Sequence, residues 1–150
     1  MPDNRDLVHI LAGHAAGLAY EDLTDAAREA AKKSVLDTFG VILAASGMEP
    51  AVRGVIEIVQ EAGGSPDSTV LGFSGKAPAM MAALANGALA HCLDYDDQTP
   101  WGQHCASSIV PAVFAVAERQ GGVTGRDLIA AVAAGQDIFA RLRRNVGWKK

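Results

Sequence analysis

The chain has 150 residues, which is enough for one domain with a substantial buried core. Its 13 basic and 17 acidic residues give a formal net charge of −4, so it lacks the positive field that holds nucleic acid. Aromatic residues make up only 5% of the chain while 49% is hydrophobic, which favours closely packed helices built from alanine and aliphatic side chains.

Apolar residues at helical spacing predict three helices in the first part of the chain. The first covers residues 6–20 and is expected to bury one apolar stripe, with His14 at its edge. The second begins after Thr24, whose hydroxyl can cap it, and runs to about residue 46. The third starts at Pro50, a residue suited to a first helical turn, and ends near Gly63.

The second helix carries three residues that interrupt its apolar surface. Gly40 costs about 1 kcal/mol relative to alanine, so we expect it to allow a neighbouring helix to approach closely. Asp37 and Thr38 are polar, and for them we predict structural hydrogen bonds rather than a functional role.

A short extended segment follows at residues 68–73, bounded by proline and glycine. The fourth helix begins at Pro78 and is apolar on nearly every side, so it should be central and buried, with its two methionines filling the core. The fifth helix is expected to be capped by Ser108, which places Pro111 in its first turn.

Thr124 and Asp127 have the spacing of a capping box, and the sixth helix runs from there toward Asn145. The prediction is therefore an all-α fold: a compact array of about six helices with at most one short strand. Residues 1–150 form a single helical domain, and the aromatic Trp148 is left without a following element to cover it.

The cysteine content and the N-terminal pattern indicate where the protein works. Two cysteines are too few for a disulfide framework, so a reducing compartment is expected. The first twenty residues lack the pattern of a signal peptide, and no run of eighteen apolar residues occurs. We therefore expect a cytoplasmic protein that has neither membrane nor nucleic acid as a partner.

The stretch from Ala85 to Ser108 concentrates the side chains with acid–base chemistry. It contains His91, aspartates at positions 94, 96 and 97, and His104. If the fourth helix persists, His91 meets Asp94 three positions later. Such a pair is useful for proton transfer but equally common as a structural contact, and the sequence leaves both interpretations open.

Three aspartates within four residues bring like charges together. Packing one of them against apolar neighbours would make it a stronger base, while a solvated acidic turn is the alternative. His104 lies just before a predicted helix N-terminus, where backbone N–H groups can also receive an anion.

Zinc binding is the main chemical alternative, because His91, Cys92, His104 and Cys105 are all zinc-ligand types. Neighbouring residues on a helix point about 100° apart, so an adjacent His-Cys pair rarely holds one ion. Neither Cys-x-x-Cys nor His-x-x-x-His occurs, and we predict no metal site.

Several segments together resemble the MmgE/PrpD family of 2-methylcitrate dehydratase-like lyases and isomerases. The main match is residues 85–97 (ANGALAHCLDYDD), followed by His104 and by residues 109–112 (IVPA). Residues 36–40 (LDTFG), 68–72 (STVLG) and 125–128 (GRDL) match further landmarks in the same order.

The resemblance implies a helical domain that carries part of an active site for cofactor-free proton chemistry on small di- or tricarboxylic acids. It places the two catalytic residues on Asp94, for proton transfer or orientation, and on His104, as the acid/base at the substrate carbon. It gives supporting or substrate-binding roles to His91, Asp97 and Gln98, and to Thr99 as well. Asp96 is a further supporting residue. The reaction would be a dehydration, a decarboxylation or an epimerisation.

The chain departs from the family pattern in two ways. Gln98 stands where threonine is common, with Thr99 one place later, and Cys105 replaces a frequent proline after the histidine. The chain also resembles only the N-terminal third or so of a family member, so we expect the isolated chain to be inactive. It would pair as a homo-oligomer, require a complementing C-terminal chain, or both. The alternative is a non-catalytic helical dimerisation or interaction module derived from the family.

Overall fold

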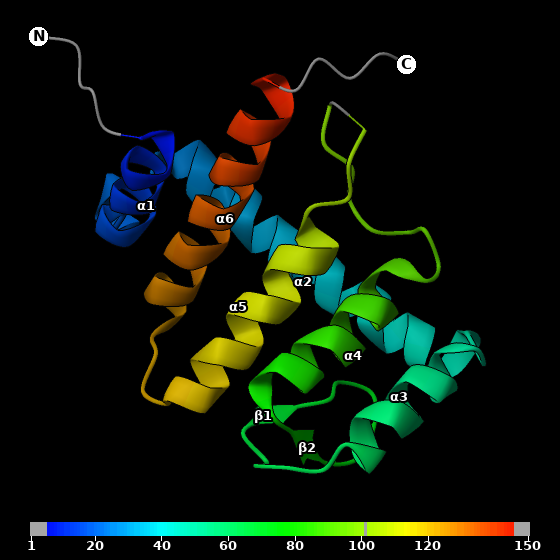
Figure 1. Ribbon diagram of the computed structural model, residues 1–150. Coiled ribbons are helices and arrows are strands. Elements are labelled where there is room, and N and C mark those ends of the chain that lie inside the picture. Colours follow the sequence, from blue (N-terminus) through cyan, green and yellow to red (C-terminus); the bar gives the residue numbers. More distant parts are fainter. Residues whose placement is uncertain (1–5, 101, 146–150) are drawn as a thin grey trace, which may run out of the picture.

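The computed structural model describes residues 6–100 and 102–145, and within them it confirms the all-α fold (Figure 1). Its helices are α1 (Leu7–Gly17), α2 (Asp25–Met48), α3 (Val52–Glu61), α4 (Ala79–His91), α5 (Ala106–Gln120) and α6 (Gly125–Asn145). A 3-10 turn, η1 (Tyr20–Asp22), precedes α2, and the strands β1 (Ser68–Thr69) and β2 (Lys76–Ala77) pair antiparallel. Trp148 lies outside the described residues.

Helix α2 is long, and α4, α5 and α6 all pack against it. Figure 1 shows it crossing behind α4, α5 and α6, which lie side by side in that order. Helix α3 packs beside α4, α1 packs against α6, and the β-hairpin closes the far end of α4 and α5. Helix α4 is central, as its apolar surface predicts, although Met80 is 81% exposed rather than buried in the core.

The core consists of two groups of buried side chains that share one aromatic residue. One group joins α4 to α2, α3 and the hairpin, and the other lies between α2, α5 and α6. Phe39 packs against both groups and meets Phe114 edge to face, with ring centroids 5.1 Å apart. Most of the other buried residues are alanine or valine, so the helices lie close together, as the low aromatic content predicts.

Small residues set the closest helix contacts, but not at the position predicted. A side chain at Gly135 of α6 would place its Cβ 2.8 Å from Cγ2 of Ile109 on α5, and one at Gly87 of α4 would lie 3.3 Å from the Ser107 carbonyl. Gly40 is exposed and a Cβ there would meet nothing within 4 Å. The predicted close contact at Gly40 is therefore wrong, because that side of α2 faces away from the neighbouring helices.

Side-chain caps fix the helix starts where the sequence places them. The Ala27 N–H donates to the Thr24 hydroxyl at 3.2 Å. Thr124 and Asp127 form the expected reciprocal box, with the Asp127 N–H 3.2 Å from the Thr124 hydroxyl and the Thr124 N–H 3.1 Å from the Asp127 carboxylate. Thr38 is fully buried and donates to the Ser34 carbonyl at 2.8 Å, which confirms its structural role.

Three local expectations need correction. Helix α1 buries none of its residues, because it lies at the edge of the array against α6. Helix α5 begins at Ala106, before Ser108, and its first turn has no side-chain cap; Pro111 therefore lies inside the helix, and the Ser107 carbonyl lacks its usual N–H partner. The extended segment gains a second short strand, because Gly72 and Gly75 have positive φ angles and turn the chain back.

Asn86 ties the hairpin to the centre of the molecule. It is fully buried in α4, accepts from the Leu71 N–H at 2.9 Å and donates to the Thr69 carbonyl at 2.9 Å. This polar residue in an apolar helix is therefore satisfied on both sides of its amide. The C-terminal end of α4 leads into the loop that connects it to α5.

Candidate active site

The loop between α4 and α5 carries most of the predicted site residues, and it is held onto α2 by hydrogen bonds. The Ser34 hydroxyl donates to the Asp97 carboxylate at 2.8 Å, and the Asp97 N–H donates to the Asp37 carboxylate at 3.1 Å. Gln136 on α6 donates to Ser34 Oγ at 2.7 Å. Two helices thus anchor Asp97, and its neighbours are positioned as a consequence.

The backbone at Asp94 changes the histidine pairing that the sequence suggests. Helix α4 ends at His91, and Asp94 has a φ of 55°, a left-handed conformation that aspartate tolerates better than most residues. The chain therefore turns before Asp94 can align with His91 along a helix. His91 instead places Nδ1 3.1 and 3.2 Å from the two carboxylate oxygens of Asp96, so the predicted His91–Asp94 pair is replaced by a His91–Asp96 pair.

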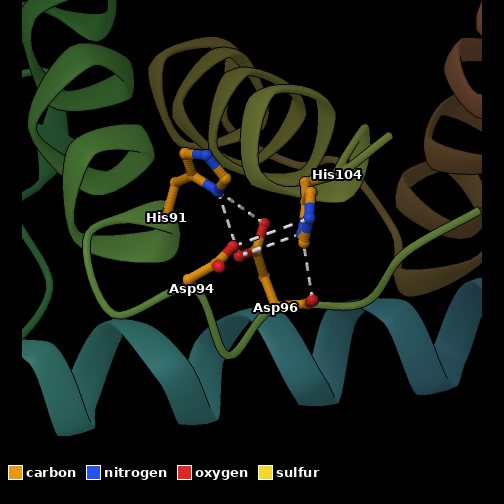
Figure 2. Close-up of side chains that lie close together, drawn as sticks. All are labelled: His91, Asp94, Asp96 and His104. Atoms are coloured by element: carbon orange, nitrogen blue, oxygen red, sulfur yellow. Dashed lines mark hydrogen bonds and ion pairs between the residues drawn. The ribbon is translucent and has the colours of Figure 1, made fainter. Parts of the chain in front are cut away.

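Asp96 is the centre of the group (Figure 2). Its side chain is fully buried, and its carboxylate lies between two imidazoles, with Oδ1 also 3.3 Å from Nδ1 of His104. The rings of His91 and His104 have centroids 5.0 Å apart. A buried carboxylate requires polar partners, and here the imidazoles supply them.

Hydrogen bonding fixes the orientation of the His104 ring. Its Nδ1 lies 3.2 Å from the main-chain carbonyl of Asp96. A carbonyl can only accept, so Nδ1 carries the hydrogen and Nε2 of the neutral ring carries the lone pair. Nε2 lies 3.3 Å from the side-chain nitrogen of Gln98 and 3.6 Å from Oδ1 of Asp94. The basic nitrogen of His104 therefore faces Asp94 and Gln98.

The side chains of this group differ widely in their exposure to solvent. The side chain of His104 is 22% exposed, that of His91 54% and that of Asp94 81%, while Asp96 lies beneath them. The buried carboxylate of Asp96 thus closes one side of the group, and the opposite side is open to solvent.

The remaining predicted residues take supporting positions in the loop. Asp97 turns toward α2, where it contacts Ser34 and Asp37, and does not join the imidazole group. Thr99 donates its N–H to the Gln103 carbonyl at 2.8 Å, and its hydroxyl accepts from the Gln103 N–H at 3.3 Å. Of the predicted set, the structure therefore gathers His91, Asp94, Gln98 and His104, and it leaves Asp97 and Thr99 as residues that hold the loop.

Asp96 has a more central place than the sequence predicts. The only sequence signal was the acidic run itself, which does not show which aspartate is buried. That choice depends on the left-handed turn at Asp94, which directs the side chain of Asp96 inward and that of Asp94 outward.

The ligand types in this group also bear on metal binding. One atom each from His91, Asp94, Asp96 and His104 lies within 4.8 Å of all the others. The cysteines of the zinc alternative are not part of this group: Cys92 is exposed with its thiol 3.6 Å from the Leu89 carbonyl, and Cys105 is buried. Burial is the main cause that raises the pKa of both thiols, which disfavours the thiolate form that binds metal.

An open groove of about 510 Å³ begins at His91 and runs between α4 and α5. It is lined mainly by small residues, together with Cys92, Ser107 and Ser108. A larger hollow of about 820 Å³ lies at the turn between α5 and α6, but none of the residues of the imidazole group lines it. Its size alone does not make it the site, because the side chains with acid–base chemistry are elsewhere.

These features define a class: an all-α protein in which a buried carboxylate holds two imidazoles, one with its basic nitrogen accessible for acid–base chemistry. Comparison with known proteins gives the family. Residues 9–150 match the MmgE/PrpD N-terminal domain, and the chain belongs to the MmgE/PrpD family.

Two relatives have described activities. The cis-aconitate decarboxylase of Mus musculus is 28% identical over 142 residues, which are 92% of this chain and 29% of the relative. That of Homo sapiens is 29% identical over 134 residues, covering 84% of this chain and 27% of the relative. The chain thus spans less than a third of the length of these relatives. None of the described helices is by itself long and apolar enough to cross a membrane.

Proposed function

We propose that the chain forms one wall of an active site that transfers a proton next to a carboxylate on a small di- or tricarboxylic acid. It would act as a fragment or small subunit of a lyase or isomerase, in a dehydration, a decarboxylation or an epimerisation. Membership in the MmgE/PrpD family supports this proposal, as does its similarity to cis-aconitate decarboxylases.

The observation that carries the proposal is the fixed orientation of His104. Its Nδ1–H is held by the Asp96 carbonyl, so Nε2 is the nitrogen that can take or give a proton. Asp94 lies 3.6 Å from this nitrogen and is open to solvent, where it can steady the ring once it is protonated. In this proposal His104 is the acid/base at the substrate carbon, and Asp94 orients it or passes the proton onward.

Asp96 acts in this proposal as a positioning residue. Its carbonyl selects the tautomer of His104, and its carboxylate holds both imidazoles from below. His91 and Gln98 would then contact the substrate or help to hold the catalytic ring. Gln98, whose amide nitrogen faces Nε2, is the residue most suited to distinguish one substrate from another.

The charges of this wall support the proposal that another part completes the site. Asp94 and Asp96 are acidic, and they would repel the carboxylates of a substrate unless cationic groups stood opposite them. We propose that these groups come from a complementing C-terminal chain, from a second copy of this chain, or from both, and that no cofactor takes part. The two unpaired cysteines support a reducing, cytoplasmic location.

Solvent deuterium exchange tests the proposal directly. The native complex is purified, its mass measured, and a set of small carboxylic acids incubated with it in D₂O. We expect exchange at a carbon next to a carboxylate, and we expect His104→Ala to abolish it. His14→Ala is the matched control, because His14 pairs with Asp137 on the α1–α6 side of the molecule and should leave exchange intact. Exchange at the wild-type rate in the His104→Ala complex would refute the assignment.

One observation favours the alternative of a non-catalytic interaction module. Leu7, Val8 and Ile10 on α1 are all exposed, as are Leu36 and Leu43 on α2. A chain that associates with a partner through such side chains needs no chemistry. Stable association without any deuterium exchange on the acids tested would favour this function over the enzymatic one.

A further inference from the structure

We propose that His91, Asp94, Asp96 and His104 also form a binding site for a transition-metal ion of the Zn²⁺ class, and that this ion inhibits rather than serves the acid–base chemistry. The site goes beyond the proposed function, because its existence depends only on the geometry of four side chains. Binding of the ion does not require that the chain be an enzyme, whereas its inhibitory effect rests on the proposed function.

The side chains have the chemistry that such an ion selects. Two imidazoles and two carboxylates form a mixed nitrogen and oxygen set, which suits zinc and its neighbours better than Mg²⁺ or Ca²⁺. One atom from each of the four residues lies within 4.8 Å of the others, so all four can reach one ion with small side-chain movements.

Two of the separations are close to those of a tetrahedral centre. Ligand atoms about 2.0–2.1 Å from zinc lie about 3.3 Å from one another in tetrahedral geometry. In the structure His91 Nδ1 is 3.1 Å from Asp96 Oδ1, and His104 Nε2 is 3.6 Å from Asp94 Oδ1. These two imidazole–carboxylate pairs face each other across the group, as Figure 2 shows.

His104 is already arranged as metal-binding histidines usually are. Such a histidine donates its second ring N–H to a carboxylate or a main-chain carbonyl, which fixes the tautomer and directs the lone pair at the ion. Here Nδ1 is 3.2 Å from the Asp96 carbonyl and 3.3 Å from its carboxylate. Nε2 can therefore coordinate without the loss of that hydrogen bond, provided that the exposed side chain of Gln98, whose nitrogen lies 3.3 Å from Nε2, moves aside.

An ion can enter from the open side of the group. The side chains of Asp94 and His91 are exposed, while that of Asp96 is buried. Within the described residues the carboxylate of Asp96 pairs with both imidazoles, and that of Asp94 lies 3.6 Å from Nε2 of His104. A divalent cation among them would neutralise the two acidic charges.

Coordination would remove the features that proton transfer needs. The ion would occupy the lone pair of His104 Nε2 and displace the proton between His91 and Asp96. Any activity that depends on His104 should fall as the ion binds.

Calorimetric titration of the isolated chain with ZnCl₂ tests the site, and its outcome does not depend on any enzymatic activity. We expect one ion per chain, and we expect His91→Gln and His104→Gln each to weaken binding by about tenfold or more. His91→Gln should fold normally because that side chain is half exposed. His14→Gln and Cys92→Ser are the matched controls, for a histidine outside the group and for the exposed thiol next to His91.

The outcomes separate clearly. Loss of binding in both histidine variants with retention in both controls supports the site. The proposal is overturned if Cys92→Ser abolishes binding, if both histidine variants bind as the wild type does, or if the wild type binds no Zn²⁺ below about 100 µM. Deuterium exchange by the complex can succeed or fail in any of these cases, so the two proposals are tested separately.

Discussion

Replacement of Ser34 by alanine should loosen the site without touching any residue of the imidazole group. Ser34 is buried in α2 and links two elements: it accepts from Gln136 on α6 at 2.7 Å and donates to the Asp97 carboxylate at 2.8 Å. The substitution removes one oxygen atom, so it leaves almost no cavity and breaks both hydrogen bonds.

The expected loss can be worked from these two contacts. A hydrogen bond to a charged group contributes about 1.5–3 kcal/mol, and a neutral one contributes about 1 kcal/mol. Alanine recovers about 0.5 kcal/mol through its better helix propensity. The free energy of unfolding of Ser34→Ala should therefore fall by about 2–3.5 kcal/mol, with Asp97 still tied to α2 through its N–H and Asp37.

Urea denaturation followed by circular dichroism measures the loss. With a slope of about 2 kcal/mol/M for a chain of this size, the midpoint should fall by about 1–1.8 M. Ser46→Ala is the matched control on the same helix, because its hydroxyl donates to the Leu43 carbonyl of its own turn and to no other group in the described part of the chain. The ring resonances of His91 and His104 should also shift in Ser34→Ala. A midpoint within about 0.2 M of wild type, with unchanged histidine spectra, would refute the idea that Ser34 holds the loop.

Two further predictions concern packing and pH. Gly135→Ala should lose about 1–2 kcal/mol of stability, because its Cβ would lie 2.8 Å from Ile109. Gly40→Ala has open space around it and should gain about 0.5–1 kcal/mol. The urea midpoint should therefore fall in the first variant and rise in the second. The hydrogen bond from the Thr124 hydroxyl is the main cause that lowers the pKa of the Asp127 carboxyl. The stability from this contact is therefore present above the ordinary pKa of about 3.9, and it is lost as the pH falls through the lowered pKa. Thr124→Ala should therefore lower the melting temperature at pH 7 and flatten its decline below about pH 4; an unchanged acid profile would contradict this reasoning.

The sequence predicts the helices well because their signals are local. Apolar spacing, Thr24 and the Thr124–Asp127 box each act within a turn or two of the chain, and the structure places the helix starts there. Burial depends on distant neighbours and is less predictable. Leu36 and Leu43 continue the apolar pattern of α2 but are exposed, because the neighbouring helices pack against the side of α2 that carries Ser34 and Thr38.

Within the site, the sequence predicts which stretch matters but not which groups meet. Helical spacing pairs His91 with Asp94 only if the helix continues, and the left-handed residue at Asp94 ends that possibility. The pairing then shifts by two positions, to Asp96. No local pattern in LDYDD indicates this turn, and Asp96 is buried where its carboxylate meets His91 at the end of α4 and His104 in the loop.

The geometry suggests how an acidic group fits the proposed site for acidic substrates. Asp96 is buried and does not face the open side, so its negative charge acts on the two imidazoles that lie against its carboxylate, where it would offset positive charge that develops during the proposed proton transfer. Asp94 is exposed and lies on the open side, where its charge would oppose a substrate carboxylate. The two aspartates therefore have separable roles: Asp96→Asn should mainly impair turnover at saturating substrate, while Asp94→Asn should alter both binding and turnover of the completed assembly.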